Sequence, residues 1–308
     1  MSSPTTSAPV ESAAPAAHSS IRPLLESLRP TQWVKNGFVF AALIFSRGLE
    51  NGRETAVVAA AAGVFCALSS AVYLVNDVFD VAEDRQHPLK RLRPVASGRL
   101  AARTATLAAV LLALIGFTFA WMLDRQFFLV AGLYACLNLA YSAGLKRIPL
   151  LDVFIVAAGF VLRVIAGGLV IHVALSDWLI VCTTLLALFL ALTKRRHEVV
   201  LLGQAAVRHR VTLVSYSPQL LDQLIAVVTA CTVMSYALYT LSADVRAKFP
   251  GKRLELTIPF VLFGIFRYLY LVHERRGGGN PTRMLLTDAV LLAVVLLWAA
   301  SVVLIIYL

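Results

Sequence analysis

The chain has 308 residues, of which 59% are hydrophobic and only 15% are charged, and its mean hydropathy is +0.78. A soluble domain carries roughly 25% charged residues, so this composition excludes an ordinary soluble protein. The formal net charge of +11 raises the question of a nucleic-acid partner. Because the cations fall in loops between apolar segments, we predict instead a membrane-embedded protein with no nucleic-acid partner.

The first twenty residues differ from the rest of the chain. They are rich in Ser, Ala, Pro and Thr, and no basic start is followed by an apolar stretch. This pattern predicts a disordered cytoplasmic tail over 1–20 and does not fit a signal peptide. We predict a single transmembrane catalytic domain over 21–308.

Apolar runs of about 17–25 residues, the length that crosses a bilayer as a helix, recur along this domain. Backbone polar groups in lipid must be satisfied within the segment, so each run is predicted as an α-helix and the fold class as all-α and polytopic. The nine predicted spans are 34–50, 55–76, 104–123, 127–143, 150–172, 177–193, 222–241, 255–272 and 285–307.

The loops between these spans differ in charge. With nine spans, most of the 28 Lys and Arg residues fall in the loops of one face. Basic loops stay in the cytoplasm. The N-terminus is therefore predicted inside and the C-terminus outside.

An acidic cluster follows the second span. Asn76, Asp80 and Asp84 are spaced i, i+4, i+8, which on a helix puts them on one face, with Asp77 close by. Stacked carboxylates repel unless a cation lies among them. Oxygen ligands of this kind suit Mg²⁺, which bridges to substrate phosphates. A solvated helix end with paired charges is the alternative.

The cluster carries a resemblance to a known family. Asn-Asp-x-x-Asp-x-x-x-Asp at 76–84 resembles the first Asp-rich motif of UbiA-type intramembrane prenyltransferases, and "RLRPVASG" (91–98) and "YSAGLKRIPLLD" (141–152) are similar to segments of the same family. The resemblance implies nine helices around a lipid-accessible cavity with its active site on the cytoplasmic side. It also implies that Asn76, Asp80 and Asp84 hold Mg²⁺ and that Arg93 and Lys146 contact phosphate.

One segment departs from that family. After the sixth span, "LTKRRHEVVLLG" (192–203) places Lys194, Arg195 and Arg196 where a second acidic motif is expected. Cations bind an anion directly, without a metal. The sequence therefore predicts one Mg²⁺-pyrophosphate substrate and one free anionic substrate.

This departure resembles the phosphoribosyltransferase branch of the family, as do "PTQWVKNGFVFAALIFS" (30–46) and "DVFIVAAGFVLRVIAGG" (152–168). The branch implies transfer of 5-phosphoribose from phosphoribosyl pyrophosphate to a polyprenyl (decaprenyl) phosphate in a bacterial plasma membrane, for cell-wall arabinan synthesis. Asp77, Asp80 and Asp84 are the predicted catalytic residues. The predicted substrate-binding residues are Lys35, Asn36, Arg91, Arg93, Lys146, Arg147, Asp152, Arg163, Lys194, Arg195 and Arg196.

Alternatives remain open at this point. Asp152 and Arg163, about three turns apart on one predicted helix, can lie on one stripe that faces the cavity. The alternative is an interhelical ion pair that only holds the bundle together. A prenyltransferase with an aromatic or haem acceptor would need a second acidic cluster, and a transporter would show repeated halves and broken helices. The sequence leaves a homo-oligomer open.

Overall fold

The computed structural model describes residues 21–88, 90–202, 215–275 and 279–308, and within these ranges the only regular elements are helices. The predicted tail, 1–20, lies outside them. Eight helices in the described part are long and apolar enough to cross a membrane. They are α3 (Gly52–Phe79), α5 (Ala102–Leu123), α6 (Arg125–Ala143), α7 (Leu151–Val170), α8 (Asp177–Leu202), α11 (Pro218–Leu241), α13 (Ile258–His273) and α15 (Ala289–Tyr307).

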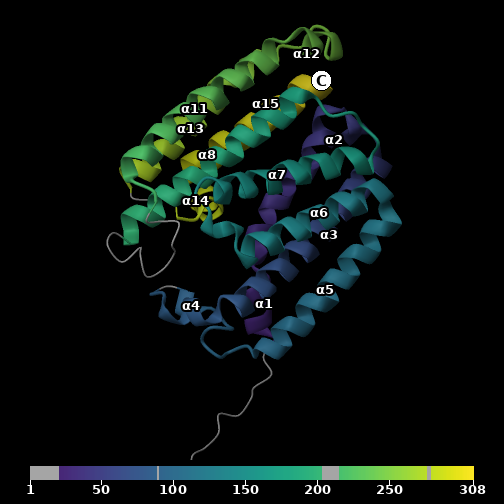
Figure 1. The fold of residues 1–308 in the computed structure, drawn as a ribbon. Coiled ribbons are helices and arrows are strands. Elements are labelled where there is room, and N and C mark those ends of the chain that lie inside the picture. The colour runs from purple at the N-terminus through teal and green to yellow at the C-terminus, as the bar shows by residue number, and fades with distance from the viewer. Residues whose placement is uncertain (1–20, 89, 203–214, 276–278) are drawn as a thin grey trace, which may run out of the picture.

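Short elements cover both ends of this bundle. One end carries α1 (Arg22–Leu28), α4 (Val81–Gln86), η3 (Lys90–Leu92), η4 (Leu145–Arg147) and α14 (Pro281–Thr287). The other carries η2 (Gly48–Glu50), α12 (Ala243–Lys248) and η6 (Leu254–Thr257). In Figure 1, α1 and α4 lie at the lower end of the bundle and α12 lies with the C-terminus at the upper end.

Polar side chains set where several of the long helices begin. Asn51, Asp124, Ser217 and Asp288 each precede a helix and accept a hydrogen bond from a backbone N–H of its first turn. Such caps satisfy donors that have no partner inside the helix. Asp124 in addition separates α5 from α6, so one apolar stretch becomes two helices joined by a single extended residue.

The first predicted span, 34–50, is not one α-helix. The structure has a 3₁₀-helix, η1 (Pro30–Phe40), followed by a short α-helix, α2 (Ala41–Phe45). Residues i and i+3 eclipse one another in a 3₁₀-helix, and burial here follows that period. Asn36, Val39 and Ala42 are buried, whereas Val34 and Gly37 are exposed. The prediction of an α-helix rested on the length of the apolar run, which does not distinguish an α-helix from a 3₁₀-helix.

This segment nevertheless runs the length of α3. Arg29, just before η1, pairs with Asp77 near the end of α3, and Gly48 lies against the side chain of Glu54 near its start. Eleven 3₁₀ residues at about 2.0 Å each and five α residues at about 1.5 Å each reach about 30 Å, the thickness of a bilayer core. The segment is therefore a ninth crossing, built differently from the other eight.

The centre of the bundle is α7. Its residues enter two hydrophobic clusters, one with η1, α3 and α6 and the other with α8, α11, α13 and α15. Figure 1 shows α7 between these two groups of helices. In the apolar stretch of α7, 67% of residues are buried, against 17% in α5, α6 and α15. The outer helices thus present apolar side chains to lipid, and α7 joins the two halves.

Gly167 sets how closely α7 approaches η1. A Cβ atom at this position would overlap the backbone carbonyl oxygen of Val39, which cannot move away by changing a rotamer. We expect Gly167→Ala to lower the free energy of unfolding by about 1–3 kcal/mol, the usual cost of overpacking. Thermal unfolding of the purified protein in detergent would measure the loss.

Gly63 in α3 is the matched control, since a Cβ there meets nothing within 4 Å. Gly63→Ala should be neutral or slightly stabilising because alanine favours a helix. Equal stability of the two variants would contradict the close approach of α7 and η1.

Candidate active site

The acidic cluster lies where α3 gives way to α4. The helix breaks at Asp80, whose φ of −89° and ψ of 7° end α3 and begin α4. The i, i+4, i+8 spacing therefore does not run along one continuous helix. Backbone hydrogen bonds of the i to i−4 kind still join Asp80 to Asn76 and Asp84 to Asp80. The prediction that Asn76, Asp80 and Asp84 share a face stays a prediction.

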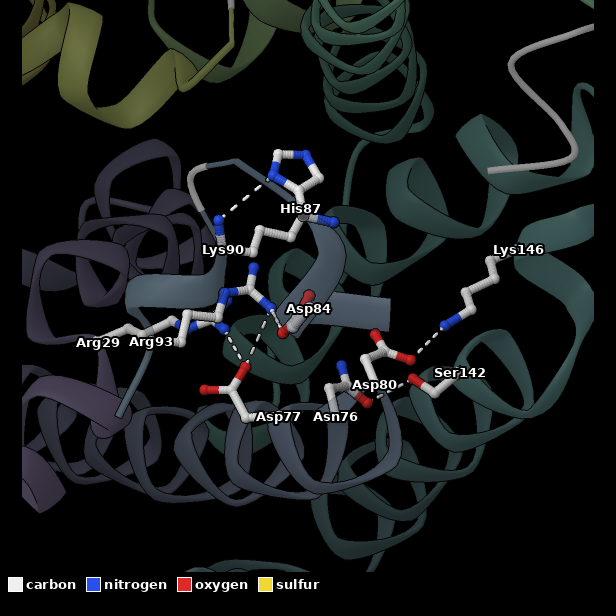
Figure 2. Close-up of polar contacts among 10 residues, drawn as sticks. All are labelled: Arg29, Asn76, Asp77, Asp80, Asp84, His87, Lys90, Arg93, Ser142 and Lys146. Atoms are coloured by element: carbon white, nitrogen blue, oxygen red, sulfur yellow. Dashed lines mark hydrogen bonds and ion pairs between the residues drawn. The ribbon is translucent and has the colours of Figure 1, made fainter. Parts of the chain in front are cut away.

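The residues of this junction form two pairs, Asp77 with Asp84 and Asn76 with Asp80 (Figure 2). Arg93 donates to Asp84 at 2.6 Å and to Asp77 at 3.2 Å, and Arg29 also donates to Asp77. Both carboxylates are almost fully buried, at 1% and 2% exposure. Each is thus satisfied by guanidinium groups that come from outside its own helix.

The second pair faces α6. Lys146, in η4, donates to Asp80 at 2.7 Å, and Ser142, near the end of α6, donates to the amide oxygen of Asn76. Asp80 is the more exposed of these acids, with 25% of its side chain open. Lys146, predicted from the sequence to contact phosphate, therefore lies directly beside the acidic cluster.

The oxygen donors at this junction fit Mg²⁺ by their chemistry. Asn76, Asp77, Asp80 and Asp84 offer one amide and three carboxylate groups within two turns, and Mg²⁺ takes oxygen ligands of this kind. In the described part of the chain, however, no three or more His, Cys, Asp or Glu side chains converge into a metal-binding group. The cations Arg29, Arg93 and Lys146 now occupy the carboxylate oxygens that an ion would use.

Lys90, in the η3 turn after α4, also lies over this cluster (Figure 2). Burial lowers the pKa of Lys90, and the cations Arg93 and Lys194 act in the same direction. Lys90 thus lies within electrostatic range of both the acidic cluster and α8.

The basic residues of α8 are not free. Arg195 is buried and donates to Asp152 at 2.6 Å and to the hydroxyl of Tyr141 at 3.0 Å, and it also pairs with Glu198. Tyr216 completes this network: its hydroxyl donates to Asp152 at 2.8 Å and accepts the backbone N–H of Leu150. Burial raises the pKa of Tyr216 to about 12, so the hydroxyl keeps the proton it donates.

The other two cations of this run also have acidic partners. Arg196 pairs with Asp222 on α11, and Lys194 lies 3.8 Å from Glu198. The expectation of three bare cations is therefore not met. Glu198 is the only acid within the sequence of segment 192–203. Asp152 and Asp222, the partners of Arg195 and Arg196, lie on other helices, so the segment alone did not reveal them.

Asp152 and Arg163 differ in their partners: Asp152 of α7 makes an interhelical ion pair with Arg195 of α8, as the alternative interpretation expects, whereas Arg163 does not pair with an acid in the described part of the chain. Arg163 is buried and donates to the side-chain oxygen of Asn36, the backbone oxygen of Gly159 and the hydroxyl of Tyr134, all within 2.7–2.8 Å. Its guanidinium also lies 4.7 Å from the Tyr134 ring centre. Within the described residues no carboxylate neutralises Arg163.

The structure thus brings six predicted residues together: Asn76, Asp77, Asp80, Asp84, Arg93 and Lys146. Arg91 and Arg147 are exposed, and their side chains make no hydrogen bond or ion pair with the described part of the chain. The sequence analysis missed Arg29, Ser142 and Tyr216. Arg29 and Ser142 adjoin or lie in the quoted segments 30–46 and 141–152, whereas nothing near Tyr216 marks it.

A small pocket lies far from these residues. It encloses about 70 Å³ at the opposite end of the bundle, and Ser46, Tyr239 and Asp244 are among the residues that line it. The predicted central, lipid-accessible cavity stays a prediction.

Comparison with known proteins decides the family. Residues 37–276 match the model of the UbiA prenyltransferase family. The chain belongs to the UbiA prenyltransferase family. This UbiA chain is 36% identical over 289 residues to a decaprenyl-phosphate phosphoribosyltransferase of Corynebacterium glutamicum, covering 92% of this chain and 86% of that protein. It is 34% identical over 292 residues to one of Mycolicibacterium smegmatis, covering 91% of each.

Solved structures agree with the UbiA fold. A UbiA homolog from Archaeoglobus fulgidus bound to GPP and Mg²⁺ superposes with a TM-score of 0.69 at 18% identity, covering 93% of this chain and all of that one. A digeranylgeranylglyceryl phosphate synthase structure superposes with a TM-score of 0.65 at 14% identity, covering 92% and 98%. These likenesses confirm the all-helical membrane fold of this UbiA-family transferase.

The ion pair between Arg195 and Asp152 allows a test of whether Arg195 holds helices together or binds substrate. Removing one partner of a buried ion pair leaves the other charge uncompensated, at a cost of about 3–5 kcal/mol. We expect Arg195→Met to lower stability by about 3 kcal/mol or more, seen as a lower midpoint of thermal unfolding in detergent.

Arg147→Met, which removes an exposed arginine, should leave the unfolding midpoint unchanged. If Arg195→Met were as stable as this control while a substrate KM rose, Arg195 would bind substrate and not hold the helices together.

Proposed function

We propose that this protein transfers 5-phosphoribose from phosphoribosyl pyrophosphate to a polyprenyl phosphate, decaprenyl phosphate by analogy with its relatives, and releases pyrophosphate. The observation that carries the proposal is the 36% identity to a decaprenyl-phosphate phosphoribosyltransferase over 92% of the chain. A likeness of this extent covers nearly the whole chain. The product would serve cell-wall arabinan synthesis.

The acidic junction is the proposed site for the leaving group. Asn76, Asp80 and Asp84 would hold Mg²⁺, with Asp77 close by, and the ion would neutralise the charge that develops on pyrophosphate. The support for this ion is the oxygen-only donor set and the Mg²⁺ bound by a UbiA homolog of the same fold.

The surrounding cations are the proposed phosphate ligands. Arg93 and Lys146 hold carboxylates in this structure, and each can exchange a carboxylate oxygen for a phosphate oxygen, since both are donors to oxygen anions. Arg91 and Arg147 are exposed beside them and add positive charge. Together they would orient the donor so that the anomeric carbon faces the acceptor.

For the transfer step, the main task of the protein is to position the two substrates. An oxygen of the lipid phosphate forms the new bond to C1 of the ribose while the bond from C1 to pyrophosphate breaks. The acceptor is already an anion at neutral pH, so no side chain has to remove a proton. Carboxylates near C1 would stabilise the positive charge that builds on the sugar.

We place the site on the cytoplasmic face of a bacterial plasma membrane. Most cations of the loops lie at the end of the bundle that carries the acidic cluster, as basic cytoplasmic loops do. The segment through η1 and α2 is a ninth crossing, so the C-terminus would lie outside. Phosphoribosyl pyrophosphate would then reach the site from the cytosol.

A second candidate is transfer of a prenyl group from a prenyl diphosphate to an aromatic or haem acceptor. The observation that favours it is the shared fold with a UbiA homolog bound to GPP. The basic residues of α8, in place of a second acidic motif, count against it.

The function is tested with the purified protein in detergent. We expect label from radioactive phosphoribosyl pyrophosphate to move into the organic phase when Mg²⁺ and polyprenyl phosphate are both present. Transfer of label from a prenyl diphosphate to an aromatic acceptor, with none from phosphoribosyl pyrophosphate, would replace this proposal with the second candidate.

The metal assignment is tested separately. Asp80→Asn and Asp84→Asn each remove a carboxylate from the proposed ion site and should lower turnover on the order of 100-fold, with a higher Mg²⁺ concentration for half-maximal rate. Asp244→Asn, an exposed acid on α12 at the other end of the bundle, is the control and should behave as wild type. An unchanged Mg²⁺ requirement in Asp80→Asn would remove that residue from the site.

A further inference from the structure

Lys35 lies on the face of η1 that points toward α7. The 3₁₀ period places Gln32, Lys35 and Phe38 on one face, all partly buried. The ring of Phe38 packs edge-on against Phe160 of α7, with centroids 5.0 Å apart. Lys35 is one turn nearer the acidic end, so its side chain also faces the interior of the bundle and not the lipid.

The charges around Lys35 are positive. Lys194, Arg163 and Arg29 are the charged groups within electrostatic range. Among the described residues no hydrogen bond or ion pair is recorded for Lys35, and Arg163 has only neutral partners. The acid nearest Arg29, Asp77, is already shared by Arg29 and Arg93.

An excess of buried positive charge is costly, because protein interiors solvate ions poorly. The cost falls when an anion enters. Lys35 of η1 and Arg163 of α7 supply this charge, and they lie close together because Asn36, next to Lys35, contacts Arg163. Lys194 of α8 is exposed and pairs with Glu198, so it does not add to the excess. This is the arrangement of an anion site, separate from the acidic junction.

Asn36 and Arg163 have a different part in this arrangement. Asn36 is buried, and its amide nitrogen donates to Cys66 of α3 at 3.2 Å while its oxygen accepts from Arg163. These contacts tie η1 to α3 and to α7. Asn36 and Arg163 are therefore positioning residues that hold η1 with Lys35 facing inward.

We propose that Lys35 binds a phosphate monoester without a metal, and that Asn36 and Arg163 hold η1 in place for this contact. The inference rests on the proposed function, since both proposed substrates carry such a group. One is the head group of the polyprenyl phosphate, and the other is the 5-phosphate of phosphoribosyl pyrophosphate. The pyrophosphate end belongs to the acidic junction.

The test uses the full-length protein in detergent and the variants Lys35→Met and Lys35→Arg. We expect Lys35→Met to raise the KM of one substrate about tenfold or more, the size expected for losing a hydrogen bond to a charged group. The KM of the other substrate should change less than twofold. Lys35→Arg keeps the charge and should recover most of the loss.

The matched control is Lys252→Met. Lys252 lies at the opposite end of the bundle and is also partly buried, and its side chain makes no hydrogen bond or ion pair among the described residues. Its KM values should equal those of wild type.

A binding measurement identifies the source of the phosphate. A short-chain polyprenyl phosphate and phosphoribosyl pyrophosphate are each titrated in EDTA, without turnover. Weaker binding of the lipid to Lys35→Met assigns the site to the lipid head group, and weaker binding of the sugar phosphate assigns it to the 5-phosphate. Unchanged binding of both, or an equal loss of both, overturns the inference.

The proposed function fails in a different way. If wild type transfers no label from phosphoribosyl pyrophosphate, the proposed reaction is wrong whatever Lys35 does. If wild type is active and Lys35→Met equals it in both KM values, only the Lys35 site is wrong.

The positioning residues are tested by non-additivity. Arg163→Met should raise the same KM as Lys35→Met with little change in kcat, and the double variant should be no worse than the poorer single one, because both changes remove one contact. Arg163→Lys should recover part of the loss. A fall in thermal stability with unchanged KM values would show that Arg163 only supports the fold and would overturn its positioning role.

Discussion

The structure depends on the pairing of buried charges, above all on the ion pair between Arg195 and Asp152. In an interior that solvates ions poorly, each charge needs a partner, and that partner has to come from another helix. Arg195 of α8 therefore holds Asp152 of α7, and Tyr216 and Tyr141 add contacts from the start of α11 and the end of α6. Four segments far apart in sequence are fixed at the end of the bundle where the acidic cluster lies. The same requirement explains why Asp77 and Asp84 both contact Arg93.

Much of the fold could be predicted from composition alone. The long apolar runs predicted eight helices because backbone groups in lipid must form their hydrogen bonds within each segment. Seven of them are close to their observed bounds, but α8 continues to Leu202, so Lys194, Arg195 and Arg196 lie on the helix and not in the predicted loop. The acidic junction was also found, since four oxygen-donor residues so close together are rare beside a membrane span. The motif resemblance implied that Lys146 and Arg93 contact phosphate, which stays a prediction; in the structure they pair with Asp80 and Asp84.

What could not be predicted depends on partners distant in sequence. The break at Asp80 separates Asn76 from Asp84, and no local pattern marks it. Asp152 pairs with Arg195 from 43 residues away along the chain, and Asp222 pairs with Arg196 from 26 residues away. The 3₁₀ geometry of η1 is set by its neighbours, through the Arg163 contact with Asn36 and the close approach at Gly167. An analysis of short stretches of sequence, taken one at a time, detects none of these contacts.

The 3₁₀-helix also has a mechanical consequence. Eleven residues in this geometry are about 5 Å longer than in an α-helix. The segment is fastened at both ends, by Arg29 to Asp77 and by the backbone N–H of Leu49 to the hydroxyl of Tyr307. The 3₁₀ geometry thus gives the segment the length to reach both contacts. Relaxation to an α-helix would need one end to detach, and it would rotate every inward-facing side chain of η1 out of register with α7.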